Sequence, residues 1–101
     1  MITIMKTKNK QEKPKWFTGA WYVKGDTVTN PFSGETYELT GPELSMYHFI
    51  QGAQYTIEMN MQKTGEFYVE DPIIIKLIDQ QRKGIDWFRS ENPKAYMVLL
   101  D

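Results

Sequence analysis

Three short signatures divide this chain, because each pairs a helix-capping side chain with a nearby proline. They are Thr40-Gly-Pro-Glu43, Asp71-Pro72 and Asn92-Pro93. Thr, Asp and Asn side chains accept hydrogen bonds from the free N–H groups at a helix start, and proline is tolerated in the first turn. Glu43 lies three residues after Thr40, which is the spacing of a capping box. The signatures predict three helices, which begin after Thr40, after Asp71 and after Asn92.

The helix expected after Thr40 carries a long apolar stripe. Its members recur at helical spacing: Met46, Phe49, Ile50, Ala53, Ile57 and Met61. A rival interpretation exists for residues 54–70, where apolar side chains alternate with polar ones as in a strand, and QKTG is a candidate turn into EFYVE. Because the stripe spans both halves of the segment, the sequence favours one helix throughout. A β-hairpin over residues 54–70 stays open as the alternative.

The helix expected after Asp71 ends before Asn92, because the residue that precedes a proline avoids the helical conformation. Asp79 and Lys83 lie four residues apart, so we expect an exposed ion pair worth roughly a few tenths of a kcal/mol. The apolar stripe of this helix consists of Ile74, Ile78, Ile85 and Phe88, with Leu77 and Trp87 beside it.

The sequence AYMVLL, one residue from the end of the chain, has the composition of a protein core. A helix of about eight residues is unstable alone in water. Each large apolar side chain left exposed would forgo roughly 1.5–3 kcal/mol of burial. The segment must therefore dock. We favour docking on its own chain; docking on another chain would make the protein a structural homo-oligomer joined through residues 93–101.

The part of the chain before these helices indicates a β-meander. Strands are expected at residues 21–23, 27–29 and 35–39, with turns at Gly25-Asp26 and between Asn30-Pro31 and Ser33-Gly34. Three strands are about the minimum for an independent sheet. We therefore predict an α+β fold, in which a three-stranded antiparallel meander packs against two longer helices and a short C-terminal helix.

Charge divides the 101 residues unequally. Residues 1–15 carry five lysines against one glutamate, or +4, whereas the remaining seven basic and twelve acidic residues give −5. We expect a basic, disordered arm over residues 1–15 and one globular domain over residues 16–101. The alternative is a nucleic-acid-binding protein that uses the sheet aromatics and the lysines of the arm: Lys6, Lys8, Lys10, Lys13 and Lys15.

Few residues of the chain are candidates for catalysis or metal binding. The chain has no cysteine and a single histidine, His48, which lies in a predicted helix without a nucleophile motif. Glu70 and Asp71 are explained as helix-start charges, and Asp79 and Asp86 as solvated ion-pair partners. The glycines form no phosphate-binding pattern. We therefore expect no enzyme, no catalytic residue, no metal and no cofactor.

Aromatic residues crowd into the segment from Trp16 to Tyr37. The sequence favours a role for them in the core, and the exposed ones among them are candidates for contact with a protein partner, since aromatics are enriched at interfaces. Base stacking is disfavoured because Lys24 is the single basic residue between Trp16 and Leu39. The candidate partner-binding residues are Trp16, Phe17, Trp21, Tyr22 and Phe32.

Two stretches, NPFSGETYELTGPELSMYHFIQGA and WFRSENPKAYMVLLD, resemble small proteins of unknown function from tailed phages, particularly marine and cyanobacterial ones. The resemblance leaves out residues 54–72 and the lysine-rich arm. It implies a cytoplasmic protein of an infected bacterium, made for interaction, and assigns no catalytic residue.

No stretch has the roughly 18–20 apolar residues of a membrane span, and the start lacks the apolar block of a signal peptide. We expect a non-enzymatic accessory protein that binds a host factor or a virion component.

Overall fold

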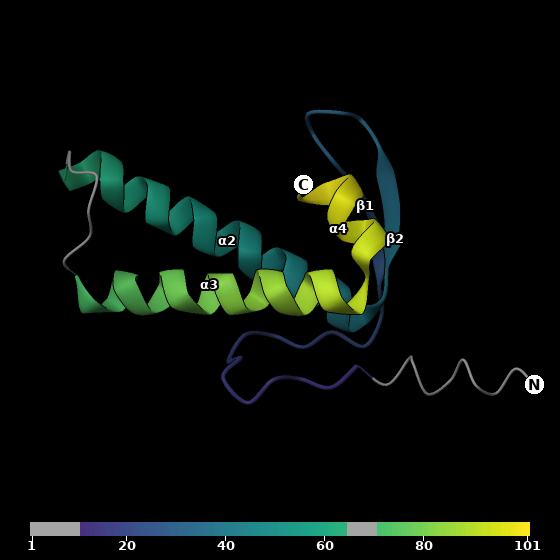
Figure 1. Ribbon diagram of the computed structural model, residues 1–101, viewed down its shortest axis with the longest axis horizontal. Coiled ribbons are helices and arrows are strands. Elements are labelled where there is room, and N and C mark those ends of the chain that lie inside the picture. Colours follow the sequence, from purple (N-terminus) through teal and green to yellow (C-terminus); the bar gives the residue numbers. More distant parts are fainter. Residues whose placement is uncertain (1–10, 65–70) are drawn as a thin grey trace, which may run out of the picture.

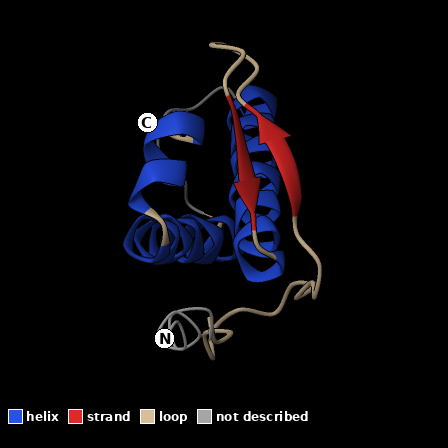
Figure 2. Cartoon of the chain, turned by 90° about the vertical axis from the view of Figure 1, so that its right-hand side faces the viewer, coloured by secondary structure: helices blue, strands red, loops and turns tan. Residues whose placement is uncertain are grey.

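The computed structural model describes residues 11–64 and 71–101, which fold as an α+β unit (Figure 1). In chain order the elements are β1 (Asp26–Thr29), β2 (Thr36–Leu39), α2 (Gly41–Thr64), α3 (Pro72–Glu91) and α4 (Pro93–Leu99). The two long helices form an antiparallel pair. Figure 2 shows the two-stranded sheet lying against α2, with α4 folded back beside it. The predicted α+β class is confirmed.

All three predicted helix starts are confirmed by their caps. The Glu43 N–H donates to Thr40 Oγ1 at 3.2 Å, and the Thr40 N–H donates to Glu43 Oε1 at 3.0 Å, which completes a capping box. The Ile73 N–H donates to the Asp71 carboxylate at 2.9 Å. The side-chain oxygen of Asn92 accepts from the Ala95 N–H at 3.1 Å. These local bonds replace the helical partners that the first N–H groups of each helix lack.

The first long helix continues to Thr64. The alternative of a β-hairpin is therefore wrong for residues 54–64, and the rest of that segment lies outside the described residues. The apolar stripe explains why the segment is a helix, because Ala53 and Ile57 are buried on the same side of α2 as Met46 and Ile50. A strand would have turned alternate side chains to opposite faces and split that stripe.

The core lies where α2, α3, α4 and β2 meet. Met46 of α2 and Phe88 of α3 are fully buried there. Gly84 lets the two long helices approach closely, since a Cβ atom on it would lie 3.0 Å from the Met46 sulfur. Ala95 and Leu99 of α4 are buried in the same cluster as Leu39 of β2. The apolar C-terminal segment thus docks on its own chain, as favoured from the sequence.

The first of the three predicted strands, residues 21–23, is wrong: the described part of the chain has a sheet of two strands, paired antiparallel with Val28 opposite Tyr37. The backbone of this segment bonds to the start of α2 instead. The Tyr22 N–H donates to the Ser45 hydroxyl at 2.6 Å. The segment passes so close to Gly41 that a Cβ atom there would overlap the backbone of Tyr22 and Val23. Residues 21–23 therefore pack on the start of α2 instead of pairing with β1.

Glu43 is a buried carboxylate that joins three segments of this fold. Besides the capping box, it accepts hydrogen bonds from the side-chain amides of Gln11 at 2.9 Å and Asn92 at 3.2 Å. Gln11 also accepts from the Thr40 hydroxyl at 2.6 Å. The chain is therefore held to the helices from Gln11 onward, a position within the arm that the sequence predicted to be disordered.

We expect Glu43→Ala to lower the free energy of unfolding by about 1.5–3 kcal/mol, because it removes the carboxylate that accepts from the half-buried amides of Gln11 and Asn92 and breaks the capping box. Urea denaturation followed by circular dichroism measures the change. Glu38→Ala is the control, since Glu38 is exposed on β2 and its loss should change stability by at most about 0.5 kcal/mol. Equal effects of the two substitutions would contradict the role of Glu43.

Two phenylalanines offer a matched test of the core. Phe88 is 0% exposed and Phe32 is 97% exposed. We expect Phe88→Ala to cost about 3–5 kcal/mol of unfolding free energy through the lost burial and the cavity left behind. Phe32→Ala should change that free energy by no more than about 0.5 kcal/mol. The midpoints of urea denaturation of the two variants measure these changes. A destabilised Phe32→Ala would contradict the exposure of that ring.

Candidate interaction surfaces

Residues 11–25, here called the strap, run across α2 and α3 without regular structure and carry four of the five candidate partner-binding residues (Figure 1). Phe17 lies in the core, 3% exposed. Its ring meets those of Trp21 at 5.3 Å and Phe49 at 5.4 Å between centroids, both edge to face. Phe17 is therefore a residue that docks the strap, and it is not among the exposed members of the set.

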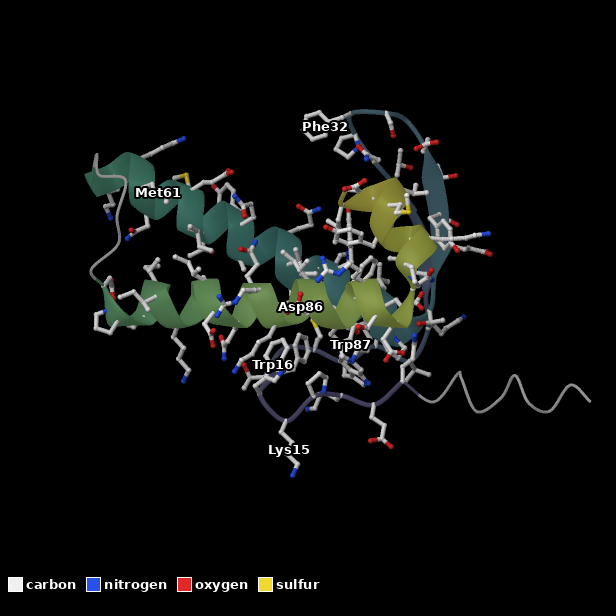
Figure 3. All side chains as sticks on the ribbon, viewed as in Figure 1. Lys15, Trp16, Phe32, Met61, Asp86 and Trp87 are labelled. Atoms are coloured by element: carbon white, nitrogen blue, oxygen red, sulfur yellow. The ribbon has the colours of Figure 1, made fainter. Side chains whose placement is uncertain are left out.

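The two strap tryptophans also pack on the long helices. Trp16 lies 5.9 Å from Phe17 and 6.0 Å from Phe49 between ring centroids. Trp21 meets Trp87 of α3 edge to face at 5.7 Å. Figure 3 shows Trp16 and Trp87 on the side of the helices that faces the strap. Such ring pairs contribute roughly 0.5–1.5 kcal/mol each beyond the burial of their area. Trp16 and Trp21 are half-buried and serve chiefly to hold the strap.

Tyr22, the last of the four, pairs with the single histidine of the chain. Its hydroxyl lies 3.2 Å from Nδ1 of His48, and the two rings meet edge to face at 5.6 Å. His48 is exposed on α2. The hydrogen bond between them fastens the end of the strap to the surface of that helix.

Phe32 differs from the other four, because it stands at the outer end of the turn between β1 and β2 (Figure 3) and is 97% exposed. The turn that carries it is organised by Asn30. The Asn30 side-chain oxygen accepts from the N–H groups of Phe32 at 2.8 Å and Ser33 at 3.3 Å. Its amide group donates to the Val98 carbonyl of α4 at 2.9 Å. The turn is thereby tied to the body of the protein.

Backbone bonds complete this turn. The Asn30 N–H donates to the Glu35 carbonyl and the Gly34 N–H to the Asn30 carbonyl, both at 2.8 Å. Gly34 has a φ of 82°, a conformation that glycine adopts without strain. The Ser33 hydroxyl accepts from the Glu35 N–H at 3.1 Å. The result is a preorganised turn that presents one uncovered aromatic ring.

A groove with a volume of about 540 Å³ lies at the other end of the molecule, where α2 and α3 separate. It is lined by Thr56, Met59, Asn60, Gln62, Lys63 and Ile74. Sequence reasoning missed it. The signal that would have found it is the run Ile73-Ile74-Ile75, because three successive helical residues cannot all face one neighbour.

The carboxylates singled out from the sequence form ion pairs on α3. Asp79 lies 2.7 Å from Arg82 and 3.4 Å from Lys83, which confirms the predicted pair. The Arg82 guanidinium and the Lys83 ammonium hold the pKa of the Asp79 carboxyl below its ordinary value. Asp86 pairs with Arg89 at 2.7 Å. Exposed pairs of this kind contribute little stability.

Of the lysines assigned to the arm, Lys13 and Lys15 are exposed, and Lys15 points away from the helices in Figure 3. Lys6, Lys8 and Lys10 lie outside the described residues.

Within residues 11–64 and 71–101, no group of three or more His, Asp or Glu side chains is placed to hold a metal ion. No helix in these same ranges is long and apolar enough to cross a membrane.

Comparisons of this chain with models of protein families, with curated proteins and with solved structures found no match.

We expect Trp21→Ala to lower the free energy of unfolding by roughly 1.5–3 kcal/mol, because the ring joins the strap to Trp87. It should also change the near-ultraviolet circular dichroism, to which adjacent indole rings contribute. Val23→Ala, two residues further along the strap at a side chain that is 93% exposed, is the control. A Trp21→Ala variant with the parent's stability and spectrum would show that the strap is not docked in this way.

Proposed function

We propose that this protein is a non-enzymatic binding protein that docks onto another protein through Phe32. The observation that carries the proposal is the exposure of that ring, 97%, on a turn fixed by hydrogen bonds. Burial of a phenylalanine side chain in a partner's pocket contributes roughly 1.5–3 kcal/mol. Because the turn is already ordered, little of that gain is lost to immobilising the chain.

The surroundings of Phe32 define the chemistry of the partner. The turn carries the acidic side chain of Glu35, and residues 25–39 contain no lysine or arginine. The partner surface that fits is an apolar pocket with a basic rim, where opposite charge speeds association. The carboxylate of Glu35 and the absence of lysine and arginine from residues 25–39 disfavour a nucleic-acid backbone as the ligand of this turn.

The setting that we propose comes from the resemblance of two stretches to small phage proteins. In that setting the partner is a host factor or a virion component. The lysines of residues 1–15 have no part in this contact. A nucleic-acid-binding protein would instead depend on them and would lose affinity steeply with salt.

The test is a pull-down from nuclease-treated bacterial lysate at low and moderate salt, with the full chain as bait. We expect one dominant protein to be retained at both salt concentrations. Phe32→Ala should weaken its affinity by about tenfold or more, since 1.4 kcal/mol corresponds to a factor of ten. Val23→Ala, at a side chain of similar exposure away from the turn, should leave the affinity unchanged.

Capture that survives Phe32→Ala would overturn the assignment of the contact. Capture that is lost at moderate salt or on deletion of residues 1–15 would favour the nucleic-acid-binding alternative. The folding of Phe32→Ala is checked by the urea midpoint already described, so lost binding cannot be confused with lost structure.

A further inference from the structure

The turn between β1 and β2, here called the Phe32 turn and comprising residues 30–35, uses its backbone N–H groups within itself. The N–H groups of Phe32 and Ser33 both donate to the side-chain oxygen of Asn30. The Asn30 N–H donates across the base of the turn to the carbonyl of residue 35. Three backbone donors are thus already paired.

The remaining positions of the turn offer no backbone donor either. The Gly34 N–H donates to the Asn30 carbonyl, and the Glu35 N–H donates to the Ser33 hydroxyl. Pro31 has no N–H group. A partner that contacts the Phe32 turn therefore finds no backbone N–H to accept from.

Acceptors, in contrast, are left over. Within the part of the chain that the structure describes, no group donates to the backbone carbonyls of four exposed residues, which are Pro31, Phe32, Ser33 and Gly34. Glu35 adds an exposed carboxylate that forms no ion pair with a described residue. A carboxylate accepts hydrogen bonds and does not donate them. Hydrogen-bond acceptors therefore surround the exposed ring.

Two side chains of the turn carry the donors that remain. The Asn30 amide is directed at the Val98 carbonyl of α4. The Ser33 hydroxyl, which accepts from a neighbouring N–H, keeps its own hydrogen free to donate. The surface that the turn presents to solvent is thus an apolar ring, several acceptors and one hydroxyl donor.

This imbalance restricts what can cover the turn. A carbonyl that is buried without a donor is costly, so the partner must bring donors to this surface. An added β-strand offers donors and acceptors in alternation. A nucleic-acid backbone offers phosphate oxygens, and a second copy of the turn offers the same carbonyls. Each of these three ligands would place acceptors against acceptors.

Arginine has the chemistry that this surface requires. Its planar guanidinium has five N–H donors and no acceptor, and it can bond two neighbouring oxygens at once. It also stacks on the face of an aromatic ring, and Phe32 is 97% exposed. Lysine offers a compact and strongly hydrated charge instead of a planar fork. One residue type can therefore satisfy the carbonyls, the carboxylate and the ring.

We propose that the partner's binding site is an apolar pocket for Phe32 with arginine on its rim. The guanidinium groups donate to the free carbonyls beside the ring and to the Glu35 carboxylate. This inference rests on the proposed docking through Phe32, and it goes beyond that proposal by naming the chemical group that the partner supplies.

Hydrogen exchange of the parent chain, followed by nuclear magnetic resonance, tests the premise without a partner. We expect the Phe32 amide to exchange at least about fivefold more slowly than that of Lys24, after correction for intrinsic rates. The Lys24 N–H has no acceptor in the described chain. Asn30→Ala should remove the protection of the Phe32 amide. A Phe32 amide that exchanges as fast as that of Lys24 would show that the turn has free donors and would overturn the inference.

The rim of the partner is tested by chemical modification, with the protein retained in the pull-down as the probe. Phenylglyoxal modifies arginine, and mass spectrometry of the retained protein gives the reactivity of each arginine. We expect at least one arginine to react about tenfold or more slowly when the parent chain is bound. Phe32→Ala at the same concentration should give no such protection.

Glu35→Gln tests the acceptor on this chain, because it replaces a carboxylate with an amide that also donates. We expect it to weaken the affinity for the retained protein by about threefold or more. Glu38→Gln is the matched control. Glu38 is exposed and pairs with Thr27, toward the end of the strands away from the turn, so its substitution should leave the affinity unchanged.

The outcomes separate this inference from the proposed function. If capture depends on Phe32 but no arginine is protected, or if Glu35→Gln binds as the parent does, the inference is overturned and the proposed function stands. Capture that survives Phe32→Ala, or no capture at all, overturns both.

Discussion

The buried carboxylate of Glu43 is the interaction on which the arrangement of this fold depends. It is 4% exposed, and a polar group at that depth is tolerated only where hydrogen bonds compensate for lost water. The bonds come from the Thr40 N–H at the start of α2, from Gln11 in the strap and from Asn92 between α3 and α4. One side chain therefore sets where the strap, the first long helix and the turn into α4 lie relative to one another.

The helix starts could be predicted from sequence because each cap is a local interaction. The capping side chains of Thr40, Asp71 and Asn92 reach N–H groups two or three residues further along the chain. The strand predicted at residues 21–23 failed for the opposite reason. Strand propensity describes how side chains fit a sheet, and it is overridden when the backbone finds another partner. That partner, Ser45, lies 23 residues away and could not be identified from the strand pattern.

The candidate site shows the same division between local and long-range interactions. The turn that carries Phe32 was predicted from Asn30-Pro31 and Ser33-Gly34, whose effects are local. The burial of Phe17 and the packing of Trp21 depend on Phe49 and Trp87, which come from two different helices. Aromatic composition alone could not show that Phe17 and Trp21 pack against the helices whereas Phe32 is exposed. The groove escaped prediction because the apolar stripe of α3 accounted for Ile74 and left Ile73 and Ile75 unassigned.

Because the covering segments lie at one end of the two long helices, stability is distributed unevenly along them. The end that carries Glu43 is covered by the strap, the sheet and α4. The distal end is held within the described chain chiefly by Ala53 and Ile57 on α2 and Ile74 on α3. Regions with few buried apolar contacts open locally at a lower free energy than the core does.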